Sequence, residues 1–156
     1  MSVQQEATKA GFQAGHVGLN VTDLERSKAF YRQVFGFELQ GGSAEAEQLY
    51  AFLGTGDRTF VTLWQQSGGR FERGRPGLHH LSFQVQSADE LRQVEARLRE
   101  LGAALLYDGI VPHATGASSA AVFFEDPDGI RLEVYSPQGV EAATVAGPAA
   151  PACGFF

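Results

Sequence analysis

The sequence predicts an α+β fold built from two copies of one βαβββ module, and three observations support this prediction. A segment of alternating apolar and polar residues occurs twice, as GHVGLNV at 15–21 and HHLSFQV at 79–85. A stretch with helical periodicity follows each of these segments. Behind each helix a pair of strand-forming segments is repeated, at 50–64 and at 120–135. Internal repetition of this kind indicates duplicated structural units.

The two opening segments are predicted to be half-buried strands. When they are aligned, His16 falls on His80, an offset of 64 residues between positions 16 and 80. In the first copy Val17 and Leu19 lie on one face, and His16 lies on the other. Since side chains alternate with a period of two along a strand, each histidine belongs to the polar face of its strand.

Each strand is followed by a predicted helix with recognisable ends. In the first copy, LERSKAFYRQVF lies between a capping residue, Thr22 or Asp23, and Gly36. In the second copy, Ser87 and Glu90 have the spacing of a capping box, and the apolar residues that follow recur with a helical period. Glycine after a helix suits the left-handed conformation that often ends it.

The second half of each module is predicted to form a strand hairpin. The two copies align with an offset of 71 residues, which places Glu133 where the first copy has Thr62. Turn signals stand between the strands, Gly56-Asp57 in the first copy and DPDG at 126–129 in the second. Two such modules side by side predict a cup-shaped mixed sheet with the helices outside and polar residues inside.

These boundaries divide the chain into an arm, one domain and a tail. The arm covers 1–13, and the domain covers 14–137, with its modules at 14–66 and 78–137. The tail at 138–156 is rich in Ala, Gly, Pro and Val, which predicts a loose segment. Its apolar end, Cys-Gly-Phe-Phe, is either a frayed terminus or a segment that docks into a groove.

Composition excludes several classes of function. The chain has 156 residues, a formal charge of −6 and a pI of about 5.1, without the clustered cations that bind nucleic acid. It has neither a signal-like start nor an apolar run long enough to span a membrane. Its single cysteine, Cys153, predicts a reducing, cytoplasmic setting. The Arg70, Arg73 and Arg75 cluster is either a solvated loop or a loop that meets an anionic substrate.

Three residues on the predicted polar faces form a candidate metal site: His16, His80 and Glu133. Two imidazoles and one carboxylate leave coordination positions open, which suits Fe(II), Mn(II), Ni(II) or Zn(II). Taken singly, each residue has a plainer interpretation, because strand histidines are commonly structural and Glu133 can pair with Arg131. The equivalence of the two histidines in a duplicated module favours the metal site.

The sequence also resembles the vicinal oxygen chelate superfamily, which includes glyoxalase I, extradiol dioxygenases, fosfomycin-resistance enzymes and bleomycin-binding proteins. The resemblance spans about residues 14–137 and is carried by HVGLNVTDLERSKAFYRQVFGFEL, HHLSFQV and FFEDPDGIRLEVY. It implies paired βαβββ modules around a divalent metal, with ligands at the positions of His16, His80 and Glu133. It further implies a homodimer and a small-molecule substrate with two neighbouring oxygens.

The sequence departs from the pattern of each subclass. Glyoxalase I-like members have a fourth ligand at the position of Thr62, and threonine is a poor ligand. The three-ligand set is more similar to ring-cleaving dioxygenases, which makes Fe(II) the first choice. Their additional histidine and tyrosine near the metal have no obvious counterpart, because the corresponding strands offer Trp64 or Gln65 and Phe123. The potassium-binding loop of fosfomycin-resistance enzymes is not evident either.

Other residues are candidates for contact with substrate. His113, in the HATGASS loop, is either a general acid or base near the mouth of the cup or a surface histidine. Trp64 and Tyr135 occupy equivalent positions and form either an aromatic wall or part of the core. Thr62 and Arg131 share the polar face and are further candidates for substrate binding.

The sequence therefore leaves several functions open. The first is a metal-dependent enzyme, with a dioxygenase slightly ahead of a glyoxalase-type lyase or isomerase. The second is a non-catalytic small-molecule binder of the bleomycin-resistance type, although such binders generally lack the ligand set. A regulatory or scaffold module has no specific support.

Overall fold

A computed structural model describes residue 11 and residues 13–139. The expectations for the tail beyond residue 139, including the Cys-Gly-Phe-Phe end, lie outside these residues. No helix in the described part of the chain is long and apolar enough to cross a membrane.

The first module has the predicted order of elements. One strand and one helix are followed by three strands: β1 (Val17–Asn20), α1 (Leu24–Phe35), β2 (Glu38–Glu45), β3 (Gln48–Thr55) and β4 (Arg58–Trp64). These strands form a four-stranded sheet in the order β1-β4-β3-β2. The parallel pair is β1 with β4, and the other pairs are antiparallel.

The second module repeats this order. Its elements are β5 (Leu81–Gln84), α2 (Ala88–Glu100), β6 (Val111–Pro112), β7 (Ala120–Glu125) and β8 (Arg131–Ser136). They form a second four-stranded sheet in the order β5-β8-β7-β6. The prediction of an α+β fold with two βαβββ modules is thereby confirmed.

Strand register confirms the alignment of the two copies residue by residue. Gly18 lies opposite Thr62 in the parallel pair of the first sheet, and Ser82 lies opposite Glu133 in that of the second. These pairs are related by the two offsets read from the sequence. Thr62 and Glu133 therefore hold equivalent places in their sheets.

Both helices begin and end where the sequence predicts. The side chain of Asp23 caps α1 by accepting from the backbone N–H of Arg26 at 2.9 Å, and Gly36 ends the helix with φ of 71°. Only glycine adopts this left-handed conformation at little cost. Ser87 and Glu90 form the capping box of α2, satisfying N–H groups that would otherwise lack partners.

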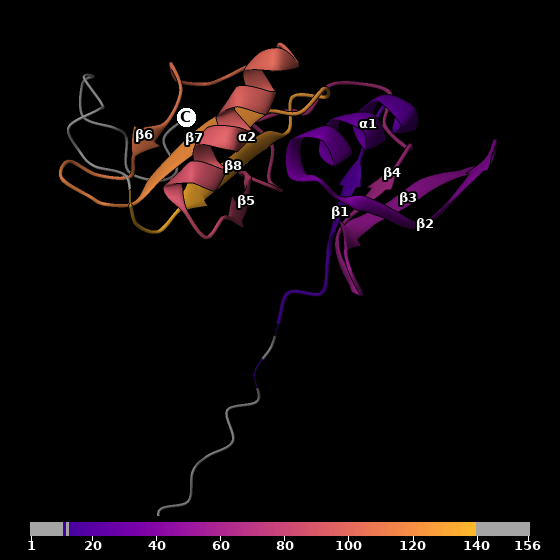
Figure 1. The fold of residues 1–156 in the computed structure, drawn as a ribbon. Coiled ribbons are helices and arrows are strands. Elements are labelled where there is room, and N and C mark those ends of the chain that lie inside the picture. The colour runs from indigo at the N-terminus through magenta and orange to yellow at the C-terminus, as the bar shows by residue number, and fades with distance from the viewer. Residues whose placement is uncertain (1–10, 12, 140–156) are drawn as a thin grey trace, which may run out of the picture.

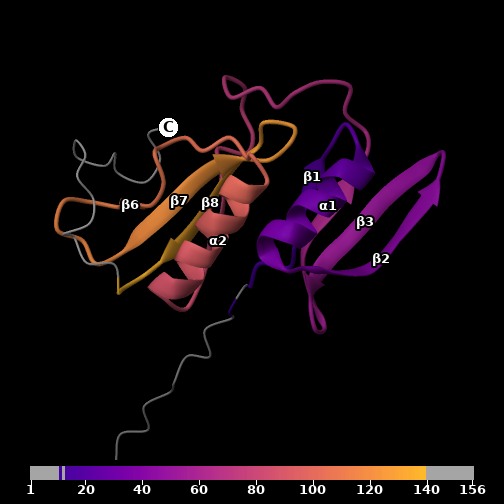
Figure 2. The same ribbon diagram turned by 45° about the horizontal axis from the view of Figure 1, so that its top comes forward.

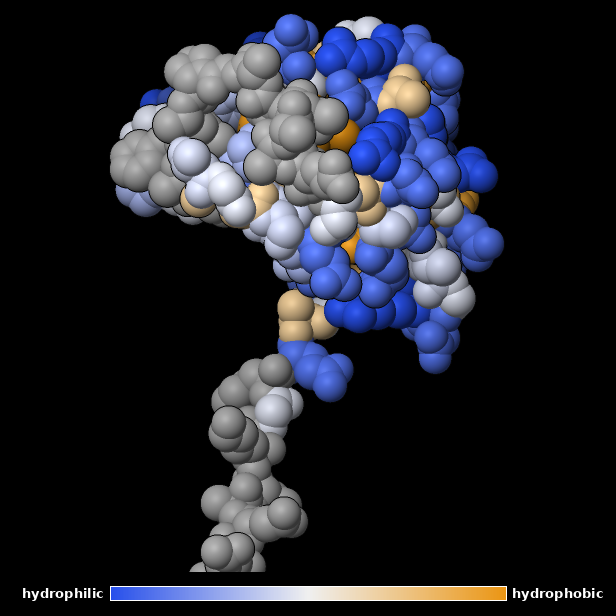
Figure 3. Space-filling view, turned by 60° about the vertical axis from the view of Figure 1, so that its left-hand side comes forward, coloured by the Kyte–Doolittle hydropathy of each residue, from blue (hydrophilic) through white to orange (hydrophobic). Residues whose placement is uncertain are grey.

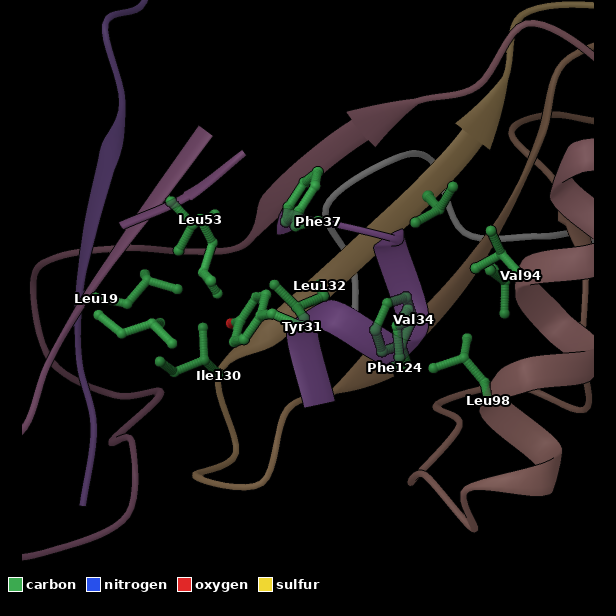
Figure 4. Packing of buried hydrophobic residues seen from close by; sticks show 14 of the residues in the cluster. Leu19, Tyr31, Val34, Phe37, Leu53, Val94, Leu98, Phe124, Ile130 and Leu132 are labelled. Atoms are coloured by element: carbon green, nitrogen blue, oxygen red, sulfur yellow. The ribbon is translucent and has the colours of Figure 1, made fainter. Parts of the chain in front are cut away.

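Helix α1 packs against both sheets, and this joins the modules into one core. Its Tyr31 and Val34 lie near Leu19 of the first module on one side and near Phe124 and Leu132 of the second on the other (Figure 4). Aromatic contacts cross the same boundary, with a centroid separation of 6.3 Å between Phe30 and Phe124 and 4.6 Å between Phe35 and Phe83.

The two helices consequently lie together in the middle of the molecule. Figures 1 and 2 show α1 beside α2, with β2 and β3 at one end and β6 and β7 at the other. The strands of one chain form two separate sheets, so the expected cup-shaped sheet is divided into two halves. Since the apolar face of each sheet packs on the shared core, each polar face is turned away from that core.

A turn of the second module docks on the start of α1. The carboxylate of Asp128 accepts from the backbone N–H of Thr22 at 3.0 Å and pairs with Arg26 at 2.6 Å. Tyr31 donates its hydroxyl to Asp126 at 3.1 Å. Burial raises the pKa of Asp126, although the hydrogen bonds that its carboxylate accepts from backbone N–H groups act in the opposite direction. It also raises the pKa of Tyr31 well above its ordinary value.

The arginine cluster between the modules pairs with carboxylates of the chain itself. Arg70 lies 3.2 Å from Glu125, Arg73 contacts the same carboxylate, and Arg75 pairs with Glu72. This agrees with a solvated loop that crosses from one module to the other.

The face drawn in Figure 3 is mainly hydrophilic, with a few isolated hydrophobic residues.

Candidate metal centre

The outer face of the second sheet places His80 beside Glu133. His80 directly precedes β5, and Glu133 lies in β8, the neighbouring strand. The distance from His80 Nε2 to Glu133 Oε2 is 3.3 Å. Glu133 is only 2% exposed, and a buried carboxylate is costly unless a charged or hydrogen-bonding group faces it. Two of the three predicted metal ligands are thus brought together.

His113 reaches the other oxygen of the same carboxylate. Its Nε2 lies 2.8 Å from Glu133 Oε1, and its Nδ1 lies 3.0 Å from the hydroxyl of Ser119. A carboxylate oxygen accepts hydrogen bonds, so Nε2 is placed to donate to Glu133 while Nδ1 faces the hydroxyl of Ser119. Sequence reasoning missed Ser119, because only the closure of the 113–119 loop brings it to His113.

His79 is the neighbour of His80 on its other side. The two Nδ1 atoms are 2.8 Å apart, and the rings meet edge to face at 5.1 Å between centroids. One ring must donate to the other, which fixes the orientation of His80 and leaves its Nε2 directed at Glu133. Alternation along a strand predicts that adjacent residues point to opposite faces, whereas in the structure the rings of His79 and His80 are in contact.

His16 and Thr62 belong to the first module. His16 is exposed just before β1, and no hydrogen bond or ion pair joins its side chain to another described residue. Thr62 is 3% exposed, and its hydroxyl accepts from the indole N–H of Trp64 at 3.1 Å. Their face is turned away from the shared core, as is the face that carries His80 and Glu133.

The remaining candidates are divided between the two sheets. Trp64 stacks on Tyr50 with ring centroids 4.9 Å apart. Tyr135 donates to Gln84 at 2.8 Å and meets His113 edge to face at 5.7 Å. Arg131 is buried on the same strand as Glu133. Within one chain Trp64 and Tyr135 therefore lie on separate sheets and border different neighbours.

The side chains gathered on the second module are of the chemical types that bind a divalent metal. His80, His113 and Glu133 offer imidazole nitrogens and a buried carboxylate, which are the usual ligands of Fe, Mn, Ni and Zn. Each of the two imidazoles lies directly against the carboxylate of Glu133. Among the described residues no three His, Cys, Asp or Glu side chains are arranged to hold a metal ion. A complete site needs a further ligand or a small rearrangement.

A comparison with protein families shows to which family the chain belongs. The model of the Glyoxalase/Bleomycin resistance protein/Dioxygenase superfamily matches residues 13–134. The chain belongs to this superfamily. Its fold is also similar to the crystal structure of a glyoxylase/bleomycin resistance protein/dioxygenase domain from Frankia sp. EAN1pec. The TM-score is 0.69 at 27% identity, covering 81% of this chain and 98% of that one.

Curated relatives in the superfamily have different activities. The chain is 30% identical to the uncharacterized protein YqjT of Bacillus subtilis, covering 78% of this chain and 97% of that protein. It is 32% identical to the catechol-2,3-dioxygenase of the same organism over 78% of this chain, but spans only 40% of that enzyme. It is also 32% identical to the lactoylglutathione lyase of Salmonella typhimurium, covering 76% of this chain and 88% of the lyase.

Proposed function

We propose that the protein is a divalent-metal-dependent enzyme acting on a small molecule with two neighbouring oxygens, with ring-cleaving dioxygenase chemistry as the first choice. The observation that carries this proposal is the buried carboxylate of Glu133, which is flanked by the Nε2 atoms of His80 and His113. Such a carboxylate is stable when it faces cations or hydrogen-bond donors, and a metal ion satisfies this requirement.

We assign the metal ligands to His80, Glu133 and His16. Because the two polar faces of one chain are turned away from the shared core, we further propose that His16 comes from a second copy of the chain. In a homodimer the first module of one copy would cover the second module of the other. The exposed side chain of His16, which has no hydrogen bond or ion pair with a described residue, supports this arrangement.

The residues around the site have separate tasks in this proposal. A bound divalent metal supplies positive charge that stabilises an oxyanion on the substrate. His113 holds a proton at Nε2 and can exchange it with a substrate oxygen that displaces Glu133 from this nitrogen. Ser119 orients His113 through Nδ1, and His79 orients His80 through its Nδ1.

The character of Thr62 supports a dioxygenase ahead of a lyase. Its hydroxyl is engaged by Trp64, and threonine is a weak metal ligand, so the first module offers one ligand rather than two. A site with three protein ligands keeps positions open for both a chelating substrate and oxygen. The catechol-2,3-dioxygenase and the lactoylglutathione lyase among the relatives represent these two alternatives.

Metal analysis of anaerobically purified protein tests the proposal. We expect about one metal ion per chain in the wild type, and its loss in Glu133→Ala, His80→Ala and His16→Ala. Thr62→Ala serves as the control and should retain the metal. Iron supports dioxygenase chemistry, whereas nickel or zinc supports a lyase. A wild-type protein that binds no metal after reconstitution refutes the proposal and favours a small-molecule binder.

A further inference from the structure

The outer face of the first sheet carries three aromatic side chains around one pocket. Tyr50 and Phe52 come from β3, and Trp64 comes from the end of β4. Tyr50 lies opposite Trp64 in the antiparallel pair, and Phe52 lies opposite Thr62, so all three rings share a face. The pocket has a volume of about 370 Å³, which is in the range of small-molecule sites.

These rings are held in position but stay accessible. Trp64 donates its indole N–H to Thr62 at 3.1 Å, which fixes the plane of its ring. Tyr50 stacks on Trp64 with an interplanar angle of 22°, and Phe52 packs against Tyr50 at 5.2 Å between centroids. Trp64 is nevertheless 36% exposed. A rigid ring with an accessible surface is ready to stack on a ligand without losing further conformational freedom.

Comparison with the second module shows which ring of this cluster is particular to the first module. Ala121 occupies the place of Tyr50, because each lies opposite the equivalent residue of its sheet, Tyr135 or Trp64. The same register places Glu133 where the first module has Thr62. Phe123 and Tyr135 hold the places of Phe52 and Trp64, so the two polar faces differ at two positions: Tyr50 against Ala121, and Thr62 against Glu133.

We infer that this pocket is a subsite for a planar aromatic ring that is uncharged or cationic. Aromatic faces stack favourably on other rings, and the amide side chains of Gln48 and Gln66 also line the pocket, where they could hydrogen-bond hydroxyl groups. Among the described residues that line the pocket, Glu47 is the only charged one, so an anionic ligand would meet a like charge and no cation.

This inference rests on the proposed function and makes it more specific. In the proposed homodimer the first module of one copy faces the histidines and carboxylate of the other. One substrate molecule could then place its ring against Tyr50, Phe52 and Trp64 and its two oxygens on the metal. The substrate class becomes an aromatic diol without a negative charge, rather than an aliphatic or anionic adduct.

Fluorescence of Trp64 tests the inference directly, because the chain contains only one tryptophan. Metal-depleted protein is titrated with catechol, and cis-cyclohexane-1,2-diol and 3,4-dihydroxybenzoate are tested as competitors. The first competitor keeps the ring size and the two oxygens but is not aromatic, and the second adds a carboxylate. We expect catechol to give a saturable change in emission and both competitors to bind at least about threefold more weakly.

Variants of the pocket provide matched controls. Tyr50→Leu and Phe52→Leu should each weaken catechol binding by roughly three- to tenfold, the effect of losing one aromatic contact. Tyr107→Leu removes a similarly half-buried tyrosine that packs on Phe123 of the second module, and should leave binding unchanged. Circular dichroism of each variant establishes that it is folded, and dissociation constants are compared rather than emission intensities.

The outcomes separate this inference from the proposed function. If catechol leaves Trp64 unaffected, or if the cyclohexane diol binds equally well, the aromatic subsite is refuted even when the protein holds its metal. If catechol binds as expected but no metal is found, the subsite stands and the enzymatic proposal fails. If the leucine variants bind catechol as tightly as Tyr107→Leu does, the pocket has been wrongly placed.

Discussion

Replacing Asp128 with alanine should remove the main polar contact between the two modules. Its carboxylate is almost fully buried, and it accepts from the backbone N–H and the hydroxyl of Thr22. Each hydrogen bond to a charged group contributes roughly 1.5–3 kcal/mol. The pair with Arg26 adds at most about 1 kcal/mol, because the side chain of Arg26 is 47% exposed. Relief from burying the carboxylate offsets part of this sum.

We therefore expect Asp128→Ala to lower the free energy of unfolding by about 2–4 kcal/mol. Urea denaturation followed by circular dichroism measures this change. Asp108→Ala is the matched control, since Asp108 is exposed and lies 3.8 Å from Arg99 in a surface pair. The control should stay within about 0.5 kcal/mol of the wild type. A loss below about 1 kcal/mol in Asp128→Ala would show that this carboxylate contributes little to holding the modules together.

Two further predictions concern titration and the orientation of His113. Burial raises the pKa of Asp126, so its contribution to stability is present at low pH and is lost as the pH rises from 3.8 through the raised pKa. Asparagine does not titrate, so the Asp126→Asn variant lacks this loss. The free energy of unfolding of the variant minus that of the wild type should therefore increase from pH 4 to pH 7. Urea denaturation at both pH values measures this difference. Ser119→Ala should lower turnover by about tenfold, because His113 loses its Nδ1 partner, while metal content stays unchanged. Equal turnover in steady-state kinetics would remove Ser119 from the mechanism.

The sequence was sufficient to predict the modules and their internal register. Periodicity identified β1 and β5, and capping residues such as Asp23 and Ser87 located the helices within one residue. The equivalence of Thr62 and Glu133 followed from aligning the copies. Each of these features depends on interactions between residues near one another in sequence or on a repeat, and both kinds of information are present in a single chain.

The relation between the modules could not be predicted in this way. Alternation determines which residues share a face of a strand, but not which sheet that face meets. The packing of α1 against Phe83 and Phe124 depends on contacts far apart in sequence. For the same reason the proximity of His113 to Glu133, and the support of His113 by Ser119, became evident only from the folded chain.

The docking of the turn at 126–129 on α1 also makes the second module dependent on the first. Its aspartates, together with the rings of Phe83 and Phe124, contact side chains of the first module. An isolated second module would expose part of these groups to water, and a helix from another molecule could cover them. The second module expressed alone is therefore expected to associate with other molecules rather than to stay monomeric.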